Sequence, residues 1–77
     1  MFIPGTKLAD HLIGTPVADV LEGYEGDDTL EGNAGNDSIT AGSGNDTAYG
    51  NTGNDTIFGN KGDDLLFGGK DDDSVSG

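Results

Sequence analysis

The stretch "GNDTAYGNTGNDTIFGN", residues 44–60, contains the triplet Asn-Asp-Thr twice, at positions 45–47 and 54–56. The two triplets start nine residues apart, and a glycine precedes each of them. The same spacing runs through the whole chain, because an aspartate recurs at every ninth position: Asp10, Asp19, Asp28, Asp37, Asp46, Asp55, Asp64 and Asp73. Residues 5–76 are therefore eight consecutive nonamers with aspartate in the sixth position.

Three other positions of the nonamer repeat in the same register. The first position is glycine in seven of the eight nonamers and alanine, Ala41, in the other. The fourth position is glycine in the third to seventh nonamers. The eighth position is always apolar, with Leu12, Leu21, Leu30, Ile39, Ala48, Ile57, Leu66 and Val75. This agreement indicates one structural unit repeated along the chain rather than a loop motif that happens to recur.

Each nonamer is predicted to be a turn followed by a short strand. Gly, Asn and Asp dominate the first six positions, and these residues tolerate the positive φ angles of tight turns. The last three positions, such as "TIF" at 56–58, form a short strand with one central apolar side chain. Strands this short need stacked neighbours. The sequence therefore predicts an all-β parallel solenoid with two nonamers per coil, two sheets, and the eighth-position side chains between them.

The pattern resembles the repeats-in-toxin (RTX) nonapeptide Gly-Gly-x-Gly-x-Asp-x-apolar-x, a repeat of calcium-binding parallel β-rolls. The nonamers "GNTGNDTIF" (50–58) and "GYEGDDTLE" (23–31) match at every position except the second glycine. The resemblance covers essentially the whole chain and implies a right-handed parallel β-roll. It weakens in the first two nonamers, where Leu8 and Val17 replace the fourth glycine. We expect residues 1–22 to form degenerate capping repeats and residues 23–77 to form the calcium-binding roll.

The resemblance also implies where Ca²⁺ would bind. In the family pattern, each ion lies between two turns on the same side of the roll. One turn contributes the backbone carbonyls of its second and fourth positions and its aspartate. The next turn on that side contributes the backbone carbonyls of its first and third positions and its aspartate. Ca²⁺ takes six to eight oxygen ligands, so two turns are needed for each ion. In one column the implied ligands are Tyr24, Gly26, Asp28, Ala41, Ser43 and Asp46, then Gly42, Gly44, Asp46, Gly59, Lys61 and Asp64. In the other they are Asn33, Gly35, Asp37, Gly50, Thr52 and Asp55, then Asn51, Gly53, Asp55, Gly68, Lys70 and Asp73.

About four Ca²⁺ ions are thus expected. A fifth site is conceivable from Thr15, Val17, Asp19, Gly32, Ala34 and Asp37, and a sixth, less favoured, would use Thr6, Leu8 and Asp10. Asp46 and Asp55 would each bind two ions, which predicts cooperative binding. The chain carries a net charge of −12 and only 31% hydrophobic residues, so we expect it to be largely disordered without Ca²⁺ and to fold on binding it.

The composition also excludes several classes of function. With 15 acidic residues against 3 Lys or Arg, nucleic acid is an unfavourable partner. No apolar run is long enough for a membrane span. The paired carboxylates fall on positions five and six of the repeat, and no catalytic triad, phosphate loop or zinc pattern is present, so we expect no enzymatic activity. His11 falls on an outward strand position and is expected to be solvated rather than a metal ligand.

The resemblance implies a module of a secreted bacterial protein, exported through a type I channel, that supports the protein's export, folding or stability where calcium is abundant. Two alternatives stay open: a structural spacer or adhesive stalk, and a polysaccharide-binding module that uses the outward aromatics Tyr49, Phe58 and Phe67. The chain ends at Gly77, the first residue of a would-be ninth repeat. A missing parent domain or end-to-end self-association is therefore also expected as a partner.

Overall fold

The computed structural model describes all 77 residues and contains nine strands of three residues each and no helix. No helix is therefore present that could cross a membrane. The strands are β1 (Phe2–Pro4), β2 (His11–Ile13), β3 (Val20–Glu22), β4 (Thr29–Glu31), β5 (Ser38–Thr40), β6 (Thr47–Tyr49), β7 (Thr56–Phe58), β8 (Leu65–Phe67) and β9 (Ser74–Ser76). Each strand after β1 occupies the last three positions of one nonamer.

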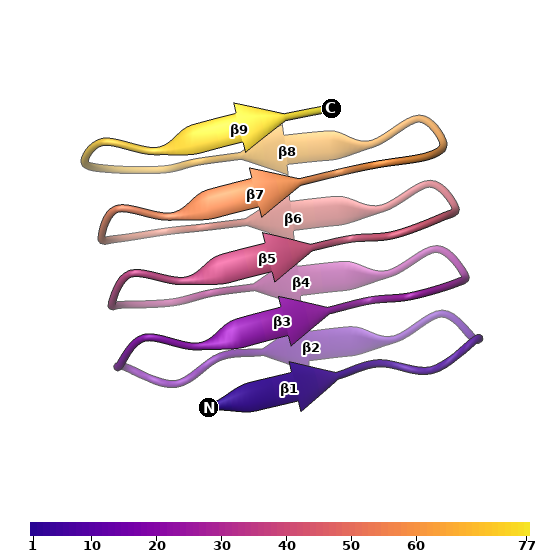
Figure 1. Ribbon diagram of the computed structural model, residues 1–77, viewed down its shortest axis with the longest axis horizontal. Helices are drawn as coiled ribbons and strands as arrows, with labels where there is room; N and C mark the ends of the chain where they lie inside the picture. Colours follow the sequence, from indigo (N-terminus) through magenta and orange to yellow (C-terminus); the bar gives the residue numbers. More distant parts are fainter.

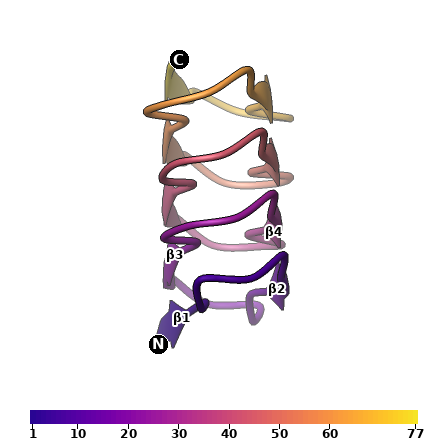
Figure 2. The ribbon, with the colours of Figure 1, turned by 90° about the vertical axis from the view of Figure 1, so that its right-hand side faces the viewer.

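The strands form two parallel sheets, one from the odd-numbered and one from the even-numbered strands. The chain passes from one sheet to the other at every turn and climbs as a right-handed coil (Figure 1). Paired residues are 18 positions apart, as in Leu30↔Ala48 and Ala48↔Leu66. Viewed from the side, the two sheets face each other and the turns stack in register (Figure 2). The predicted right-handed parallel β-roll with two nonamers per coil is confirmed.

Strand β1 was not expected, because the eight nonamers were counted from Gly5. Residues 2–4 nevertheless follow the strand part of the repeat, with the apolar Ile3 in the central position. They pair with β3 through Ile3↔Leu21, which continues the 18-residue spacing. The parallel pairing of the odd-numbered sheet therefore extends to residues 2–4, ahead of the first complete nonamer.

The core is a single file of apolar side chains between the sheets. Leu21, Leu30, Ile39, Ala48 and Ile57 are fully buried, and Leu12 and Leu66 pack against them with partial exposure. The prediction for the eighth position is wrong only at Val75, which is 46% exposed because its strand, β9, is the outermost of its sheet. Ala41 is also fully buried in this cluster, although it follows a strand and was not expected in the core.

Two ladders of side-chain hydrogen bonds tie the stacked turns together. In the first, Oδ1 of each sixth-position aspartate from Asp28 to Asp73 accepts the backbone N–H of the aspartate 18 residues earlier, at 2.7–2.9 Å. In the second, a fifth-position side chain accepts the fifth backbone N–H of the turn 18 residues later, at 2.7–3.0 Å. The acceptors of the second ladder are Asp27, Asn36, Asn45 and Asn54. The first ladder donates toward the later turn and the second toward the earlier turn, and the second was not predicted.

Truncation of the core tests this packing. Ile39 lies between Leu21 and Ile57 in its sheet and has no exposed surface. We expect Ile39→Ala to lower the free energy of unfolding of the calcium-saturated protein by about 2–5 kcal/mol, measured by denaturant titration. Ile13→Ala is the matched control, because Ile13 is 53% exposed, and its effect should stay below about 1 kcal/mol. Equal losses for the two variants would contradict this core.

Candidate metal centre

The sixth-position aspartates form two columns, one along each line of stacked turns. Asp10, Asp28, Asp46 and Asp64 share one column, and Asp19, Asp37, Asp55 and Asp73 share the other. Five of these aspartates, Asp19, Asp28, Asp37, Asp46 and Asp55, are at most 3% exposed. Carboxylates are almost never this buried unless a hydrogen-bond partner or a cation stabilises them.

The second carboxylate oxygen distinguishes the aspartates of the third to seventh nonamers. While Oδ1 accepts the ladder hydrogen bond, Oδ2 is buried and has no hydrogen-bond partner in Asp28, Asp37, Asp46, Asp55 and Asp64. A buried acceptor without a partner is unfavourable, and a run of them in successive turns is rare in stable proteins. These oxygens therefore have the character of ligands for a cation.

A glycine in the first position creates room beside four of these five oxygens, the exception being that of Asp46. A Cβ atom on Gly23 would lie 2.6 Å from Oδ2 of Asp28 and 2.5 Å from the carbonyl oxygen of Ala41. A Cβ atom on Gly50 would lie 2.5 Å from Oδ2 of Asp55 and 2.7 Å from the carbonyl oxygen of Gly68. A carboxylate oxygen of one turn and a carbonyl oxygen of the next turn thus face the same small space, and both are oxygens of the kind that Ca²⁺ prefers.

The backbone of the central turns directs further carbonyls at the neighbouring turn. A Cβ atom on Gly42 would collide with the carbonyl oxygen of Tyr24, and one on Gly44 with that of Gly26. This orientation follows from positive φ angles at the second and fourth positions in every nonamer from the third to the eighth. The residues are Tyr24, Gly26, Asn33, Gly35, Gly42, Gly44, Asn51, Gly53, Asn60, Gly62, Gly69 and Asp71. Two of the second-position carbonyls also accept hydrogen bonds, Tyr24 from Ser43 and Asn51 from Lys70.

Burial makes the central carboxylates reluctant to ionise when no cation is bound. Loss of hydration raises the pKa of Asp37 and of Asp46 to about 6, and the neighbouring aspartates in each column add to the shift. The pKa values of Asp28 and Asp55 are raised for the same first reason. A cation between the turns would reverse this penalty, because it favours the charged form.

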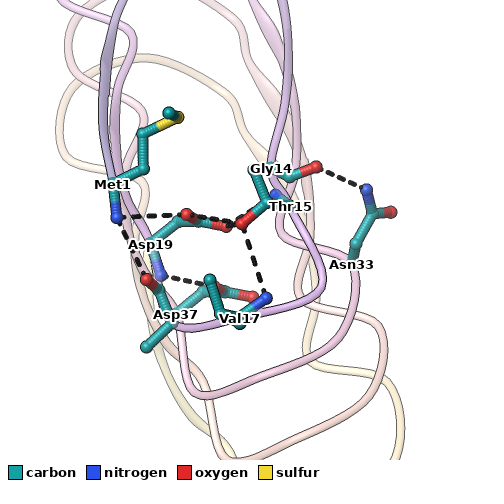
Figure 3. A network of polar contacts seen from close by, with 8 residues as sticks. Met1, Gly14, Thr15, Val17, Asp19, Asn33 and Asp37 are labelled. Atoms are coloured by element: carbon teal, nitrogen blue, oxygen red, sulfur yellow. Dashed lines mark hydrogen bonds and ion pairs between the residues drawn. The ribbon is translucent and has the colours of Figure 1, made fainter.

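The first two nonamers have a different turn. None of their residues has a positive φ angle, and the threonine in the second position binds the aspartate of its own turn. Oδ2 of Asp19 accepts the backbone N–H of Thr15 at 2.6 Å and its hydroxyl at 3.0 Å, as Figure 3 shows. Asp10 and Thr6 make the same contacts. These carboxylates are therefore satisfied within their own turns, and a threonine four residues before the aspartate is the sequence signal for this.

Asp19 also receives a positive charge. The N-terminal ammonium of Met1 lies 3.2 Å from Oδ1 of Asp19 and donates to the carbonyl of Ala18 (Figure 3). The Thr15 hydrogen bonds, together with this ammonium, lower the pKa of Asp19, in contrast to the raised pKa values of the central aspartates. In the next turn of this column, the side-chain amide of Asn33 donates to the carbonyl of Gly14 at 2.8 Å.

All of the expected ligand residues lie in the stacked turns, and those implied for one ion come from two successive turns of one column. No three His, Cys, Asp or Glu side chains gather at one point. A cation here would therefore take two carboxylates at most and its remaining ligands from backbone carbonyls. Lys61 and Lys70 have exposed side chains, as expected for residues that would contribute carbonyls only.

A comparison with protein families identifies the repeat. The profile of the RTX calcium-binding nonapeptide repeat (4 copies) matches residues 5–39, 13–48 and 49–77. The chain belongs to this family. No curated protein and no solved structure matched the chain. RTX repeats are structural calcium-binding modules rather than catalytic ones. This agrees with the interpretation of the paired carboxylates as positions five and six of the repeat.

The only histidine, His11, lies outside the RTX turns. It is in strand β2, where its Nε2 lies 2.7 Å from Oε2 of Glu31 on the neighbouring strand. The His11 side chain is 56% exposed. It faces solvent, as predicted, on the outer surface of the RTX roll.

Proposed function

We propose that this chain is a calcium-dependent folding module of a secreted protein, in which Ca²⁺ ions between stacked turns complete the β-roll. The observation that carries the proposal is the series of five buried Oδ2 atoms without a hydrogen-bond partner, in Asp28, Asp37, Asp46, Asp55 and Asp64. Each belongs to a turn in which backbone carbonyls face the neighbouring turn. Divalent cations would satisfy these oxygens and offset the net charge of −12.

The number of ions follows from pairs of central turns. We assign one ion to each pair of aspartates Asp28/Asp46, Asp46/Asp64, Asp37/Asp55 and Asp55/Asp73, with carbonyls from the same turns as ligands. This gives four Ca²⁺ ions, with Asp46 and Asp55 each shared by two. The shared carboxylates support cooperative binding, since the ion bound first orders the turn that the second one needs.

We further propose that residues 1–22 form a cap that does not need calcium. The Thr6 and Thr15 contacts occupy the carboxylates of Asp10 and Asp19, so these turns offer no unpaired carboxylate oxygen to an ion. A Ca²⁺ ion between Asp19 and Asp37 would have to break the Thr15 hydrogen bonds. The fifth and sixth sites are therefore not part of the proposed set, and residues 23–77 carry the calcium-binding repeats.

The proposed role in secretion rests on the dependence of the fold on charge neutralisation. A chain with these acidic columns would stay unfolded where calcium is scarce and fold outside the cell, where calcium is millimolar. In the RTX family this behaviour suits export through a type I channel, and it would support folding and stability of a larger secreted protein. A calcium-stiffened spacer or adhesive stalk would use the same property.

The polysaccharide-binding alternative gains less support. Tyr49 and Phe67 lie on adjacent strands, with ring centroids 5.1 Å apart and an interplanar angle of 8°. Sugars pack on the faces of aromatic rings, and here each ring covers one face of the other. Phe58 lies on the other sheet and is 42% exposed. The stack therefore contributes mainly to the cohesion of neighbouring coils.

Far-ultraviolet circular dichroism tests the proposal directly. At neutral pH we expect the spectrum of a disordered chain in EDTA and a β spectrum with millimolar Ca²⁺, because the ion relieves the charge repulsion in the two columns. Titration calorimetry should give about four ions per chain. Mg²⁺ at the same concentration is the control. It should fold the chain poorly, because it prefers octahedral coordination by six ligands and usually keeps several of its water molecules. Equal spectra in EDTA and calcium would contradict the proposal.

A further inference from the structure

Ala41 is the one first-position residue of the eight nonamers that is not glycine. It starts the turn that contains Asp46, at the centre of one aspartate column. Ala41 has no exposed surface, and its backbone N–H donates to the carbonyl of Phe58 at 2.8 Å. Its methyl group therefore lies inside the coil and not in solvent.

The equivalent glycines show what a side chain in this position meets. At Gly23, Gly32 and Gly50, a Cβ atom would lie 2.5–2.6 Å from Oδ2 of the aspartate in the same turn. The same Cβ atom would lie 2.5–3.1 Å from the carbonyl oxygen of the first-position residue in the next turn on that side. By the 18-residue repeat, the oxygens that correspond to these around the Ala41 methyl group are Oδ2 of Asp46 and the carbonyl oxygen of Gly59.

We propose that Ala41 makes the calcium site between Asp46 and Asp64 the weakest of the four, so that this site fills last. The inference rests on the proposed calcium function and assigns an order to its sites. Ca²⁺ binds oxygens at 2.3–2.6 Å, so an ion held by Asp46 and the Gly59 carbonyl would press against the methyl group. The glycines of the other three sites, Gly23, Gly32 and Gly50, leave this space free.

The effect is confined to one side of Asp46. The site that Asp46 shares with Asp28 uses the carbonyl oxygen of Ala41, which faces Gly23 and is independent of the methyl group. The same aspartate would therefore serve one strong and one weak site. In the other column, Asp55 would serve two strong sites, because both Gly32 and Gly50 are glycine.

The test compares Ala41→Gly and Gly50→Ala with the unchanged chain by calcium titration calorimetry. We expect three tight sites and one weak site in the unchanged chain. Ala41→Gly should tighten the fourth site by about tenfold or more, since the affinity of calcium sites follows ligand geometry over several decades. Gly50→Ala introduces the same methyl group at the Asp55/Asp73 site and should reduce the tight sites to two.

Backbone amide resonances give a site-specific readout of the same experiment. In the unchanged chain, the amides of Lys61 and Asp64 should reach their calcium-bound shifts at a higher Ca²⁺ concentration than those of Thr52 and Asp55. In Ala41→Gly the two sets should move together. Identical titrations for the unchanged chain and Ala41→Gly would overturn the inference, as would failure of Ala41→Gly to fold at saturating calcium. Absence of calcium binding in every variant would instead overturn the proposed function together with it.

Discussion

Replacing Asp46 with asparagine is expected to raise the Ca²⁺ concentration for half-maximal folding by about tenfold or more and to reduce its cooperativity. Asp46 is 1% exposed, and in the proposed arrangement its carboxylate binds two ions. The amide oxygen of asparagine can still accept the backbone N–H of Asp28, which lies 2.7 Å from Oδ1. The substitution therefore removes a charge and a ligand but keeps the ladder. Calcium titration followed by circular dichroism measures both quantities.

Asp63→Asn is the matched control, because it removes the same charge from the same column of turns. Asp63 is exposed, and its side chain accepts no ladder hydrogen bond. In Asp63→Asn the Ca²⁺ concentration for half-maximal folding should change by less than about twofold, as expected for a screened surface charge. The prediction is wrong if the two variants shift the midpoint equally.

A second readout separates a ligand role from a purely structural one. Without calcium, the raised pKa of Asp46 shows that its charge opposes the folded state. Asp46→Asn should therefore leave the calcium-free chain as ordered as the unchanged chain, or more ordered, while weakening the calcium-bound form. A residue that only supports the fold would lose stability in both conditions.

Acid should partly substitute for calcium. Asp37 and Asp46 have ordinary pKa values of 3.8 that rise to about 6 in the folded chain, so the folded state binds protons more tightly than the unfolded state. Each such carboxyl destabilises the folded state by about 3 kcal/mol once it is ionised. Stability without calcium should therefore be greatest below about pH 4 and fall as the pH rises through 6. The raised pKa values of Asp28 and Asp55 act in the same direction, and only the lowered pKa of Asp19 opposes them.

Circular dichroism in EDTA between pH 3 and 8 tests this dependence, with β structure expected to appear on acidification. In saturating calcium the sign reverses, because protons compete with the ion for the same carboxylates. The calcium-loaded chain should then lose stability as the pH falls below about 4, where these carboxyls, with an ordinary pKa of 3.8, take up protons in the unfolded chain. A calcium-free spectrum that does not change with pH would contradict the raised pKa values.

The sequence was sufficient to predict the architecture because the turn glycines, the aspartates and the apolar strand residues all recur with the same nine-residue period. Aspartate in the sixth position and an apolar residue in the eighth fix where each turn and strand lie. The 18-residue coil then follows from the need to bury those apolar residues between two sheets. The same periodicity identified the carboxylate columns, including the positions of Asp46 and Asp55 with a stacked turn on either side. The exceptions lie at the first and last strands, β1 and β9, where a neighbour is present on one side only.

Which oxygens are available to an ion was decided only by the tertiary structure. Asp19 and Asp37 occupy the same repeat position, yet Thr15 satisfies the first while Oδ2 of the second has no partner. The fifth-position ladder and the surroundings of Ala41 likewise depend on which atoms of turns 18 residues apart face each other. Sequence by itself determines the order and period of the residues. The direction of carbonyls and carboxylate oxygens depends on backbone angles and close contacts between coils, and these exist only once the turns are stacked.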